Sequence, residues 1–382
     1  MTPPKNPKVL LLTNVISPYR IPVFNHLAKK TDILFVFLCE MLREWKLKVY
    51  LSKIKFAYVV LKGIQVFFRK KEFTLHLNRG FLRLLIKEKP DVIVSTGYTY
   101  IESILGLIYA KLKNKKFILW SGTTLNSSES KNLIVCKIKR AIITRCDSFL
   151  AYGSEAADYL IRYGADKDKI VISRNAIEVE NFSVESKKYV VDKESLKERY
   201  NLPMLNILFC GRLVPCKNLL SLINAFSLLD CKQCGLIIIG DGYKKDEYFN
   251  YCSSNNIKNV FFKGHQDFEE LVKYYLISDI FVLPSNREIW GLVVNEAMAC
   301  GLPVICSNKA GAAKDLIKDG VNGYTFNPDD VNELKDKLAT LLNDGDKRKK
   351  MGQNSLRIIK DCTPEKYAED LLKAIDLANC NI

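Results

Sequence analysis

Two cations and two acids in the second half of the sequence have the types and spacing that binding of a phosphorylated, polyhydroxylated ligand requires. Arg212 and Lys217 follow the apolar run 206–210 and stand five residues apart. A planar arginine fork and a lysine point charge both suit phosphate oxygens. Glu288 and Glu296 stand eight residues apart, and carboxylates accept hydrogen bonds from pairs of hydroxyl groups. These four residues indicate a site for an anion that also carries hydroxyl groups.

Glycines and a predicted helix surround these four residues. The pattern predicts a helix that starts near Gly291 and stops at Gly301, and its free N–H groups at Trp290–Leu292 would point outward as an anion site. Gly211 and the run Gly240-Asp241-Gly242 each end an apolar stretch, and each alone is only a turn. The alternative for the two acids is a solvated surface position, which does not explain why both flank the helix start.

The elements that must position these residues follow a regular alternation. Short runs rich in Val and Ile alternate with helical patterns, which is typical of parallel sheets built from strand–helix units. The runs that predict strands are 9–13, 33–38, 91–95, 116–120, 148–151 and 170–173, then 206–210, 235–239, 260–263, 280–284, 303–306 and 323–326. The polar stretch 178–200 predicts a linker. We therefore expect an α/β protein with two doubly wound, Rossmann-like domains, residues 1–182 and 183–360, facing each other across a cleft.

Composition excludes several classes of protein. The 382 residues are 48% hydrophobic and 26% charged, which excludes a mainly disordered chain. The longest apolar runs fall far short of the roughly 20 residues that span a bilayer, and the N-terminus does not resemble a signal peptide. The sequence predicts a soluble, cytoplasmic protein.

The net charge of +16 lies entirely in the first half of the chain. Residues 1–182 hold 31 Lys and Arg against 15 Asp and Glu, whereas residues 183–382 hold 27 of each. A basic half beside a neutral half suggests an anionic partner, either a membrane surface or a nucleic acid. A proteome that is rich in lysine throughout is the alternative explanation.

Residues 41–75 fit the strand–helix alternation less well, because basic and apolar residues alternate there. One interpretation is an interfacial segment whose aromatic residues meet lipid headgroups while its lysines meet anionic lipid. The other is an edge strand or hairpin whose solvated lysines block pairing with a second sheet.

The twelve cysteines are scattered through both halves, and several lie in apolar runs. This is the pattern of buried free thiols in a reducing compartment. Cys231 and Cys234 have the spacing of a metal or redox pair, but no second pair accompanies them, so we interpret the spacing as coincidence. The three histidines share no metal-ligand spacing.

The order of these motifs resembles the retaining glycosyltransferases of family four, which are group one glycosyl transferases with the GT-B fold. The matching motifs are Gly-Arg-Leu…Lys at 211–217, Ile-Gly-Asp-Gly at 239–242, Phe-Lys-Gly at 262–264, and Glu-x7-Glu at 288–296 running into Glu-Ala-Met-Ala-x-Gly-x-Pro-Val-Ile. The resemblance is strong over residues 205–345. It is looser in the first half, at 17–22, 89–93 and 175–177.

The resemblance assigns a role to each matching residue. It implies that the catalytic residues are Glu288, Arg212 and Lys217. It implies that the donor is bound by Gly211, Arg212, Lys217, Gly264, Glu288, Trp290, Gly291, Leu292 and Glu296, with Glu288 on the sugar and Glu296 on the ribose. Candidates for the acceptor pocket are Tyr19, Arg20, Tyr98, Trp120 and Ser121, although aromatic core packing explains Tyr98 and Trp120 equally well.

The resemblance implies a metal-independent transfer, with retention, of a hexosyl or N-acetylhexosaminyl group and without any cofactor. The donor would be a nucleotide-diphosphate sugar, with UDP favoured over GDP. The acceptor would be lipid-linked or a glycan in cell-surface polysaccharide or glycolipid synthesis, reached by a basic N-terminal domain on the anionic inner membrane face. We expect residues 361–382 to form a helix that packs back toward that domain.

Two departures from the family and two alternative functions remain at this point. The chain has Ser17-Pro18-Tyr19 where many relatives have a glycine-rich loop, and it has no histidine after the strand at 117–120. A nucleotide-sugar epimerase of the same fold is one alternative, and Glu-x7-Glu favours the transferase over it. A nucleic-acid-binding protein is the other, but no nucleic-acid motif is present, so we expect no nucleic-acid partner.

Overall fold

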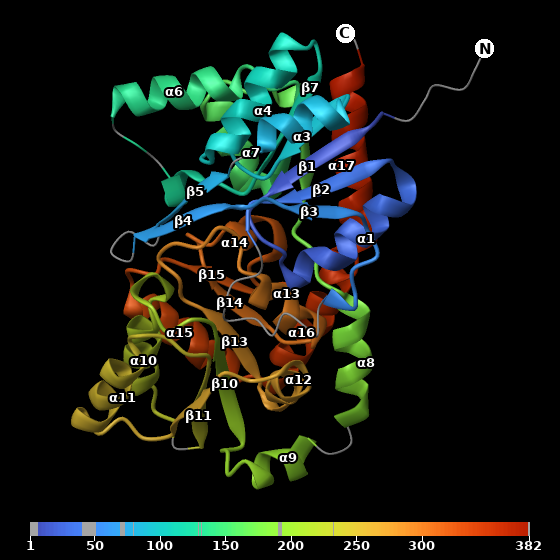
Figure 1. Cartoon of the computed structure of the whole chain (residues 1–382). Coiled ribbons are helices and arrows are strands. Elements are labelled where there is room, and N and C mark those ends of the chain that lie inside the picture. The colour runs from blue at the N-terminus through green and yellow to red at the C-terminus, as the bar shows by residue number, and fades with distance from the viewer. Residues whose placement is uncertain are drawn as a thin grey trace. The chain divides into compact units, whose positions relative to one another are not determined.

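The computed structural model describes residues 7–39, 51–68, 73–78, 80–128, 130, 132–189, 193–231 and 233–380. The chain divides into two compact units (Figure 1). Unit 1 comprises Met1–Asn175 together with Pro364–Ile382, and unit 2 comprises Ala176–Thr363. The first boundary falls before the predicted one at residue 182, because the chain beyond Asn175 leads into a helix that packs within unit 2.

Seven strands form one parallel sheet in unit 1, in the order β3-β2-β1-β6-β7-β8-β9. They are β1 (Val9–Thr13), β2 (Ile33–Phe37), β3 (Tyr58–Val60), β6 (Val92–Ser95), β7 (Lys116–Ser121), β8 (Ser148–Tyr152) and β9 (Ile170–Ser173). Strands β1 and β6 are buried along their whole length, because a parallel sheet is covered on both faces. The six strands predicted for the first half are confirmed, with ends that differ by a residue or so.

Helices cover the sheet of unit 1 (Figure 1). They are η1 (Pro18–Arg20), α1 (Ile21–Lys30), α3 (Phe81–Glu88), α4 (Ile101–Leu112), α5 (Leu125–Ser128), α6 (Leu133–Ile143), α7 (Gly153–Arg162), η3 (Lys167–Lys169) and α17 (Pro364–Asn379). Helices α3 and α4 share an apolar core with β1, β6 and β7 that includes Phe81, Leu107 and Phe117. Helix α17 contacts α1, β7, β8 and β9, so the last helix of the chain belongs to unit 1.

An antiparallel hairpin follows β3 in the sequence. Its strands, β4 (Gly63–Phe68) and β5 (Phe73–Asn78), pair from Gly63 opposite Asn78 to Phe68 opposite Phe73. Of the segment 41–75, residues 41–50 and 69–72 lie outside the described residues. In the described part β3 is an edge strand and β4 and β5 form a hairpin, as the second interpretation of this segment predicts.

Six parallel strands form the sheet of unit 2, in the order β12-β11-β10-β13-β14-β15. They are β10 (Leu205–Cys210), β11 (Cys234–Ile239), β12 (Val260–Gly264), β13 (Ile280–Leu283), β14 (Val304–Ser307) and β15 (Gly323–Phe326). Their core includes the fully buried side chains of Phe209, Leu222 and Leu338. The predicted strands of the second half are confirmed, and the chain is an α/β protein with two parallel sheets.

Unit 2 also contains helices where the sequence predicts a linker. Its helices are α8 (Val179–Tyr189), α9 (Lys193–Arg199), η5 (Pro215–Lys217), α10 (Leu219–Ser227), α11 (Lys245–Ser254), α12 (Phe268–Ile277), α13 (Leu292–Ala299), α14 (Gly311–Leu316), α15 (Val331–Leu342) and α16 (Gly345–Ile359). The linker prediction for 178–200 is wrong, because α8 packs on α12 and α13. Phe182 supplies the apolar contact: it is buried against Phe268 and Tyr275.

Cys231 and Cys234 form a disulfide at the start of β11, so the interpretation of their spacing as coincidence is wrong. The other described cysteines form no disulfide. Of the three that lie in or beside apolar runs, Cys210 and Cys306 are buried, as the runs predict, and Cys300 is half-buried. Within the described ranges, no helix combines the length and apolar character that crossing a membrane needs. No group of three or more His, Cys, Asp or Glu residues in that same part of the chain could hold a metal ion.

Candidate functional site

The strand order of unit 2 brings the predicted donor residues together. The chain runs from β10 outward to β11 and β12, then crosses back to β13 on the other side of β10. Ligands of doubly wound sheets bind outside the carboxyl ends of the strands at such a reversal. The loops that follow β10 and β13 meet there, because the Asn286 N–H donates to the Cys216 carbonyl at 2.9 Å. Sequence order alone separates these loops by about 70 residues.

Lys217 and Glu288 form an ion pair across the two loops. Their side chains are 14% and 16% exposed, so the pair is largely but not completely withdrawn from water. Gly211 lies against the lysine, since a Cβ atom at this glycine would stand 3.8 Å from Lys217 Cε. Arg212 is exposed, and no described residue pairs with its guanidinium group, which leaves that cation available for an anionic ligand.

The glycine turn after β11 packs directly on the loop after β10. A Cβ atom on Gly240 would lie 2.0 Å from the Gly211 carbonyl oxygen, and one on Gly242 would lie 2.4 Å from the Leu213 carbonyl oxygen. The Gly264 carbonyl accepts from the Gly240 N–H at 2.8 Å. These contacts bring the predicted Gly264 position next to the Gly211 loop, and they explain a motif that the sequence shows only as a turn.

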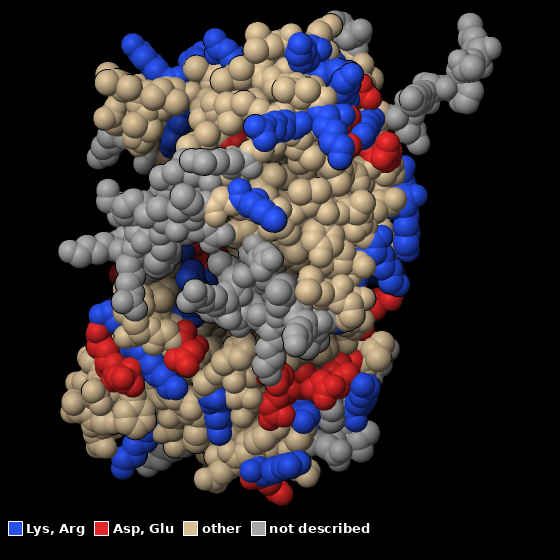
Figure 2. Space-filling view, viewed as in Figure 1, with Lys and Arg blue, Asp and Glu red and all other residues tan. Residues whose placement is uncertain are grey.

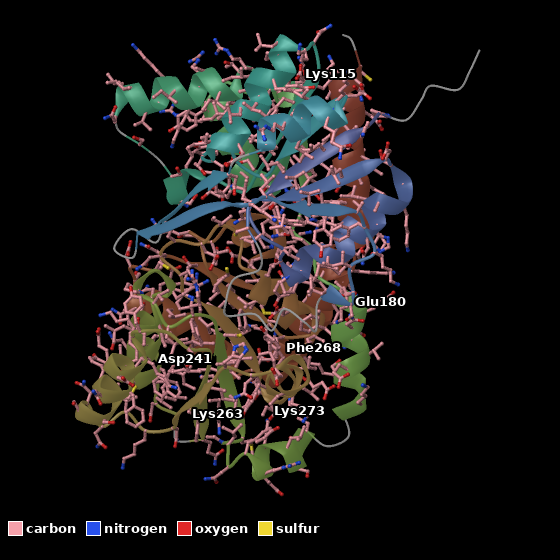
Figure 3. All side chains as sticks on the ribbon, viewed as in Figure 1. Lys115, Glu180, Asp241, Lys263, Phe268 and Lys273 are labelled. Atoms are coloured by element: carbon pink, nitrogen blue, oxygen red, sulfur yellow. A yellow bond between two sulfur atoms is a disulfide. The ribbon has the colours of Figure 1, made fainter. Side chains whose placement is uncertain are left out.

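Figure 3 labels two charged residues of these neighbouring loops. Asp241 follows β11, and Lys263 stands near the end of β12. The Asp241 carbonyl accepts from the Leu213 N–H at 2.8 Å. The ammonium of Lys263 lies 5.6 Å from the centre of the Phe261 ring. The backbone of Asp241 is therefore joined to the loop after β10, and the Lys263 side chain lies along its own strand.

Helix α13 begins where the sequence predicts, with Gly291 as its N-cap at a φ of 97°. Only glycine adopts this backbone conformation easily, and a Cβ atom there would also stand 2.7 Å from Leu283 Cδ2. The indole N–H of Trp290 donates to Asn295 Oδ1 at 2.9 Å. No acidic residue occupies the first turn of α13, and the acid next to the N-cap is Glu288, whose Cδ would stand 3.9 Å from a Cβ atom on Gly291.

The turn before α13 is pinned to the start of α14. The Gly311 N–H donates to the Glu288 carbonyl at 3.1 Å, and the Ala312 N–H donates to the Trp290 carbonyl at 3.0 Å. A Cβ atom on Gly311 would stand 2.0 Å from the Ile289 carbonyl oxygen. The Glu288 backbone is thus fixed on one side by unit 2's own fold, while its carboxylate meets Lys217 on the other.

Glu296 is 1% exposed and accepts a hydrogen bond from the Tyr275 hydroxyl at 2.7 Å. Burial raises the pKa of Tyr275 well above its usual value, so the phenol stays a donor. Burial, followed by the charge of Glu296, raises the pKa of the Cys210 thiol to about 12. The sequence analysis missed Tyr275 and Asn295, and no local motif marks either of them.

Of the five acceptor candidates in unit 1, three are buried. Trp120 is 2% exposed and donates from its indole N–H to the Tyr367 hydroxyl at 2.7 Å. Ser121 is buried and accepts from the Thr123 N–H at 3.2 Å. Tyr98 is buried and shares a hydrogen bond with the Tyr159 hydroxyl.

The other two candidates are the residues of η1 that lie nearer the surface. Tyr19 is exposed, and the partly buried Arg20 stacks on Trp120 with 4.3 Å between the guanidinium carbon and the ring centre. Two of the five candidates, Arg20 and Trp120, are therefore in contact. Tyr98 is not part of this contact, because its hydroxyl pairs with Tyr159 on α7.

The fold is shared with glycosyltransferases of known structure. HepE of Anabaena, in a complex with UDP, matches 97% of this chain and 99% of its own with a TM-score of 0.76, at 17% sequence identity. A glycosyltransferase from Rickettsia africae matches 99% of this chain and 100% of its own, also with a TM-score of 0.76, at 16% identity. The protein therefore has the GT-B fold, as predicted.

Sequence comparison agrees with the fold. Residues 192–357 match the family described as glycosyl transferases group 1. An uncharacterised glycosyltransferase of Methanocaldococcus jannaschii is 30% identical over 236 residues, which cover 60% of this chain and 66% of that relative. The capsular polysaccharide biosynthesis glycosyltransferase CapM of Staphylococcus aureus is 26% identical over 335 residues, 83% of each chain.

Proposed function

We propose that this protein transfers a sugar from a nucleoside diphosphate sugar to a lipid-linked or glycan acceptor in the synthesis of a cell-surface polysaccharide or glycolipid. The observation that carries the proposal is the convergence of Arg212, Lys217 and Glu288 at the strand reversal of unit 2. The name of CapM places that relative in capsular polysaccharide synthesis. HepE is known in complexes with UDP and with UDP-glucose, which favours a uridine donor for this chain.

Each group at the reversal can perform one part of the transfer. Arg212 and Lys217 would hold the donor diphosphate, and the N–H groups at the start of α13 would add partial positive charge. Glu288 would accept hydrogen bonds from hydroxyl groups of the sugar. Glu296, oriented by Tyr275, would accept them from the ribose. These roles need no movement of strands, because the loops already meet.

In the proposed reaction the bond between the anomeric carbon and the diphosphate oxygen breaks. The acceptor hydroxyl bonds to the same face of the sugar, so configuration is retained, and its proton passes to a leaving phosphate oxygen. The diphosphate gains negative charge as it departs, and fixed cations stabilise that charge in the transition state. We propose that the Arg212 and Lys217 side chains make a metal ion or cofactor unnecessary. An epimerase would need the same donor site but no acceptor.

Calorimetric titration with UDP and GDP tests the donor site. We expect the wild-type protein to bind UDP more tightly than GDP. The variant Arg212→Ala/Lys217→Ala should weaken UDP binding roughly 10²–10⁴-fold, because two charge-assisted contacts of roughly 1.5–3 kcal/mol each disappear. A matched variant, Lys273→Ala/Lys335→Ala, also removes two positive charges from unit 2, but takes them from α12 and α15.

The matched variant should bind UDP as the wild type does. If both double variants weaken UDP binding equally, the effect is one of general charge, and the proposed donor site is contradicted. If the wild-type protein binds neither nucleotide but binds duplex DNA or RNA tightly, the transferase proposal as a whole is contradicted.

We also propose that unit 1 rests on an anionic membrane, at the inner face if the protein is cytoplasmic. Ten large apolar side chains on α3, α4 and α6 are exposed. We call them the unit 1 apolar surface: Leu82, Ile86, Ile101, Ile104, Ile108, Leu112, Leu133, Ile134, Val135 and Ile138. The same three helices carry exposed basic residues, among them Arg83, Lys111 and Lys137, and Figure 2 shows blue atoms over unit 1. Apolar side chains beside basic ones suit an interface with anionic lipid.

Sedimentation with lipid vesicles tests this surface. The variant Leu133→Asn/Ile134→Asn/Ile138→Asn should lose binding to vesicles that contain phosphatidylglycerol by about tenfold or more, because three apolar contacts with lipid are removed. The control Met204→Asn/Leu228→Asn/Leu356→Asn changes three exposed apolar residues of unit 2 and should bind as the wild type does. Equal binding by both variants contradicts a membrane role for α6.

A further inference from the structure

Arg20 is a partly buried cation that has no anionic partner among the described residues. No hydrogen bond or ion pair joins its guanidinium group to any described residue, and its Nη1 atom is buried with no acceptor. The guanidinium carbon lies 4.3 Å from the centre of the Trp120 ring and 5.2 Å from that of Tyr152. Burial lowers the pKa of Arg20 from its usual value.

Aromatic rings alone do not satisfy this group. A cation over an aromatic face is attracted by the ring, but the ring accepts no in-plane hydrogen bond from the guanidinium N–H groups. Buried arginines normally donate these N–H groups to oxygens. The platform beneath Arg20 is itself fixed, since the Trp120 indole is hydrogen-bonded to Tyr367. The guanidinium N–H groups of Arg20 thus have no hydrogen-bond acceptor among the described residues.

The fold places Arg20 where a ligand of unit 1 would bind. Strand order reverses between β1 and β6 in this sheet, and Arg20 stands in the loop after β1. Hydroxyl groups line the ends of the same two strands, with Thr96 Oγ1 donating to Thr13 Oγ1 at 2.9 Å. Gly97, which follows β6, has a φ of 110° and open space where a Cβ atom would point. The same rule that locates the donor site in unit 2 therefore locates a second site here.

We propose that Arg20 binds a phosphoryl group of the acceptor, an inference that rests on the proposed transferase function. The planar guanidinium can donate two parallel hydrogen bonds to phosphate oxygens. The excess of 16 positive charges in residues 1–182 favours a multiply charged anion over a single carboxylate. The phosphoryl group would come from a lipid diphosphate or from a phosphorylated sugar. Arg20 acts as a specificity residue that selects phosphorylated acceptors.

Pyrophosphate is the first probe, in a chain whose donor cations are removed by Arg212→Ala/Lys217→Ala. We expect this protein to bind pyrophosphate at one site in calorimetry, with a change in tryptophan fluorescence from Trp120. Adding Arg20→Gln should weaken binding by about tenfold or more, and Arg20→Lys should restore part of it, because the charge returns without the planar fork. The matched control Arg162→Gln removes an exposed arginine of α7 and should leave binding unchanged.

The outcomes separate this proposal from a structural role and from the donor site. If pyrophosphate binds the donor-deficient protein equally with and without Arg20→Gln, or does not bind it at all, the proposal is overturned. A structural role predicts that Arg20→Gln lowers Tm, whereas loss of an unpaired buried charge should leave Tm unchanged or raise it. UDP binding by the single variant Arg20→Gln should equal that of the wild type. Failure of the wild type to bind UDP contradicts the transferase function. The pyrophosphate titration can still be interpreted in that case, because it does not depend on UDP binding.

Two further ligands identify the source of the phosphoryl group. Binding of farnesyl diphosphate more tightly than pyrophosphate, and dependent on Arg20, assigns the site to a lipid-linked acceptor. Arg20-dependent binding of glucose 6-phosphate in preference to farnesyl diphosphate assigns it to a phosphorylated sugar. Binding of either ligand that is indifferent to Arg20→Gln overturns the proposal.

Discussion

Replacing Lys217 by alanine is expected to lower turnover roughly 10²–10³-fold, because one fixed cation no longer stabilises the departing diphosphate. Glu288→Gln should lower turnover by at least roughly 10²-fold, because the ion pair that orients Lys217 is lost together with a charged acceptor for sugar hydroxyls. The measurement is sugar transfer with saturating UDP-sugar and an acceptor extract. Stability should change far less than activity, since both side chains keep some contact with water.

The double variant distinguishes a shared role from two separate ones. Because Lys217 and Glu288 contact each other, their effects on turnover should combine to less than the product of the single losses. Each single variant should lower Tm by only a few degrees, which corresponds to about 1 kcal/mol in a unit of this size. Lys273→Ala, which removes a cation 2.9 Å from Glu270 on α12, should leave turnover unchanged. A fall in Tm that matches the loss of turnover would contradict a catalytic role.

Trp120→Ala is expected to destabilise unit 1 by about 3–5 kcal/mol, the range for removing a large buried aromatic side chain. The Trp120 ring contacts Phe24, Tyr152 and Tyr367, with 5.4 to 6.2 Å between ring centres. Its removal leaves a cavity and also leaves the buried Tyr367 hydroxyl without its donor. Denaturant unfolding, followed with hydrogen exchange of unit 1 peptides, measures the loss.

Two comparisons test the explanation for Trp120. Trp120→Phe should cost less, because the volume is largely kept and only the hydrogen bond to Tyr367 is lost. Hydrogen exchange in unit 2 should stay as in the wild type, since the three rings that contact Trp120 all belong to unit 1. If Trp120→Ala leaves unit 1 stable, Trp120 does not hold the core together and the acceptor role gains weight.

The strands were predictable because a strand that is buried on both faces consists almost entirely of apolar residues, which are visible in the sequence as short apolar runs. The runs at 9–13 and 33–38 correspond to β1 and β2 almost residue for residue. Residues 178–200 were not predictable in this way. Among the described residues of the two helices there, the buried apolar side chains are few, such as Phe182 and Leu196. So few apolar residues among many charged ones do not give the periodic pattern by which an amphipathic helix is recognised in a sequence.

The candidate site was predictable as a set of residues but not as a set of contacts. The spacing of Glu288 and Glu296 was visible in the sequence, because both belong to one turn and helix. The pairing of Lys217 with Glu288 and of Glu296 with Tyr275 joins separate elements, so only the folded chain reveals them. The unpaired state of Arg20 was equally invisible, since it depends on what packs around the loop after β1.

The place of α17 has a consequence for how this protein is made. Unit 1 lacks its last helix until Ala176–Thr363 has been synthesised, which takes about 10–40 s at ordinary ribosome speeds. During that interval Trp120 and Tyr152 lack Tyr367, the aromatic partner that α17 supplies. Unit 2 is continuous in sequence and has no such wait. The half of the chain that leaves the ribosome first should therefore finish folding last, and a nascent chain stalled before Pro364 should be a preferred client of chaperones.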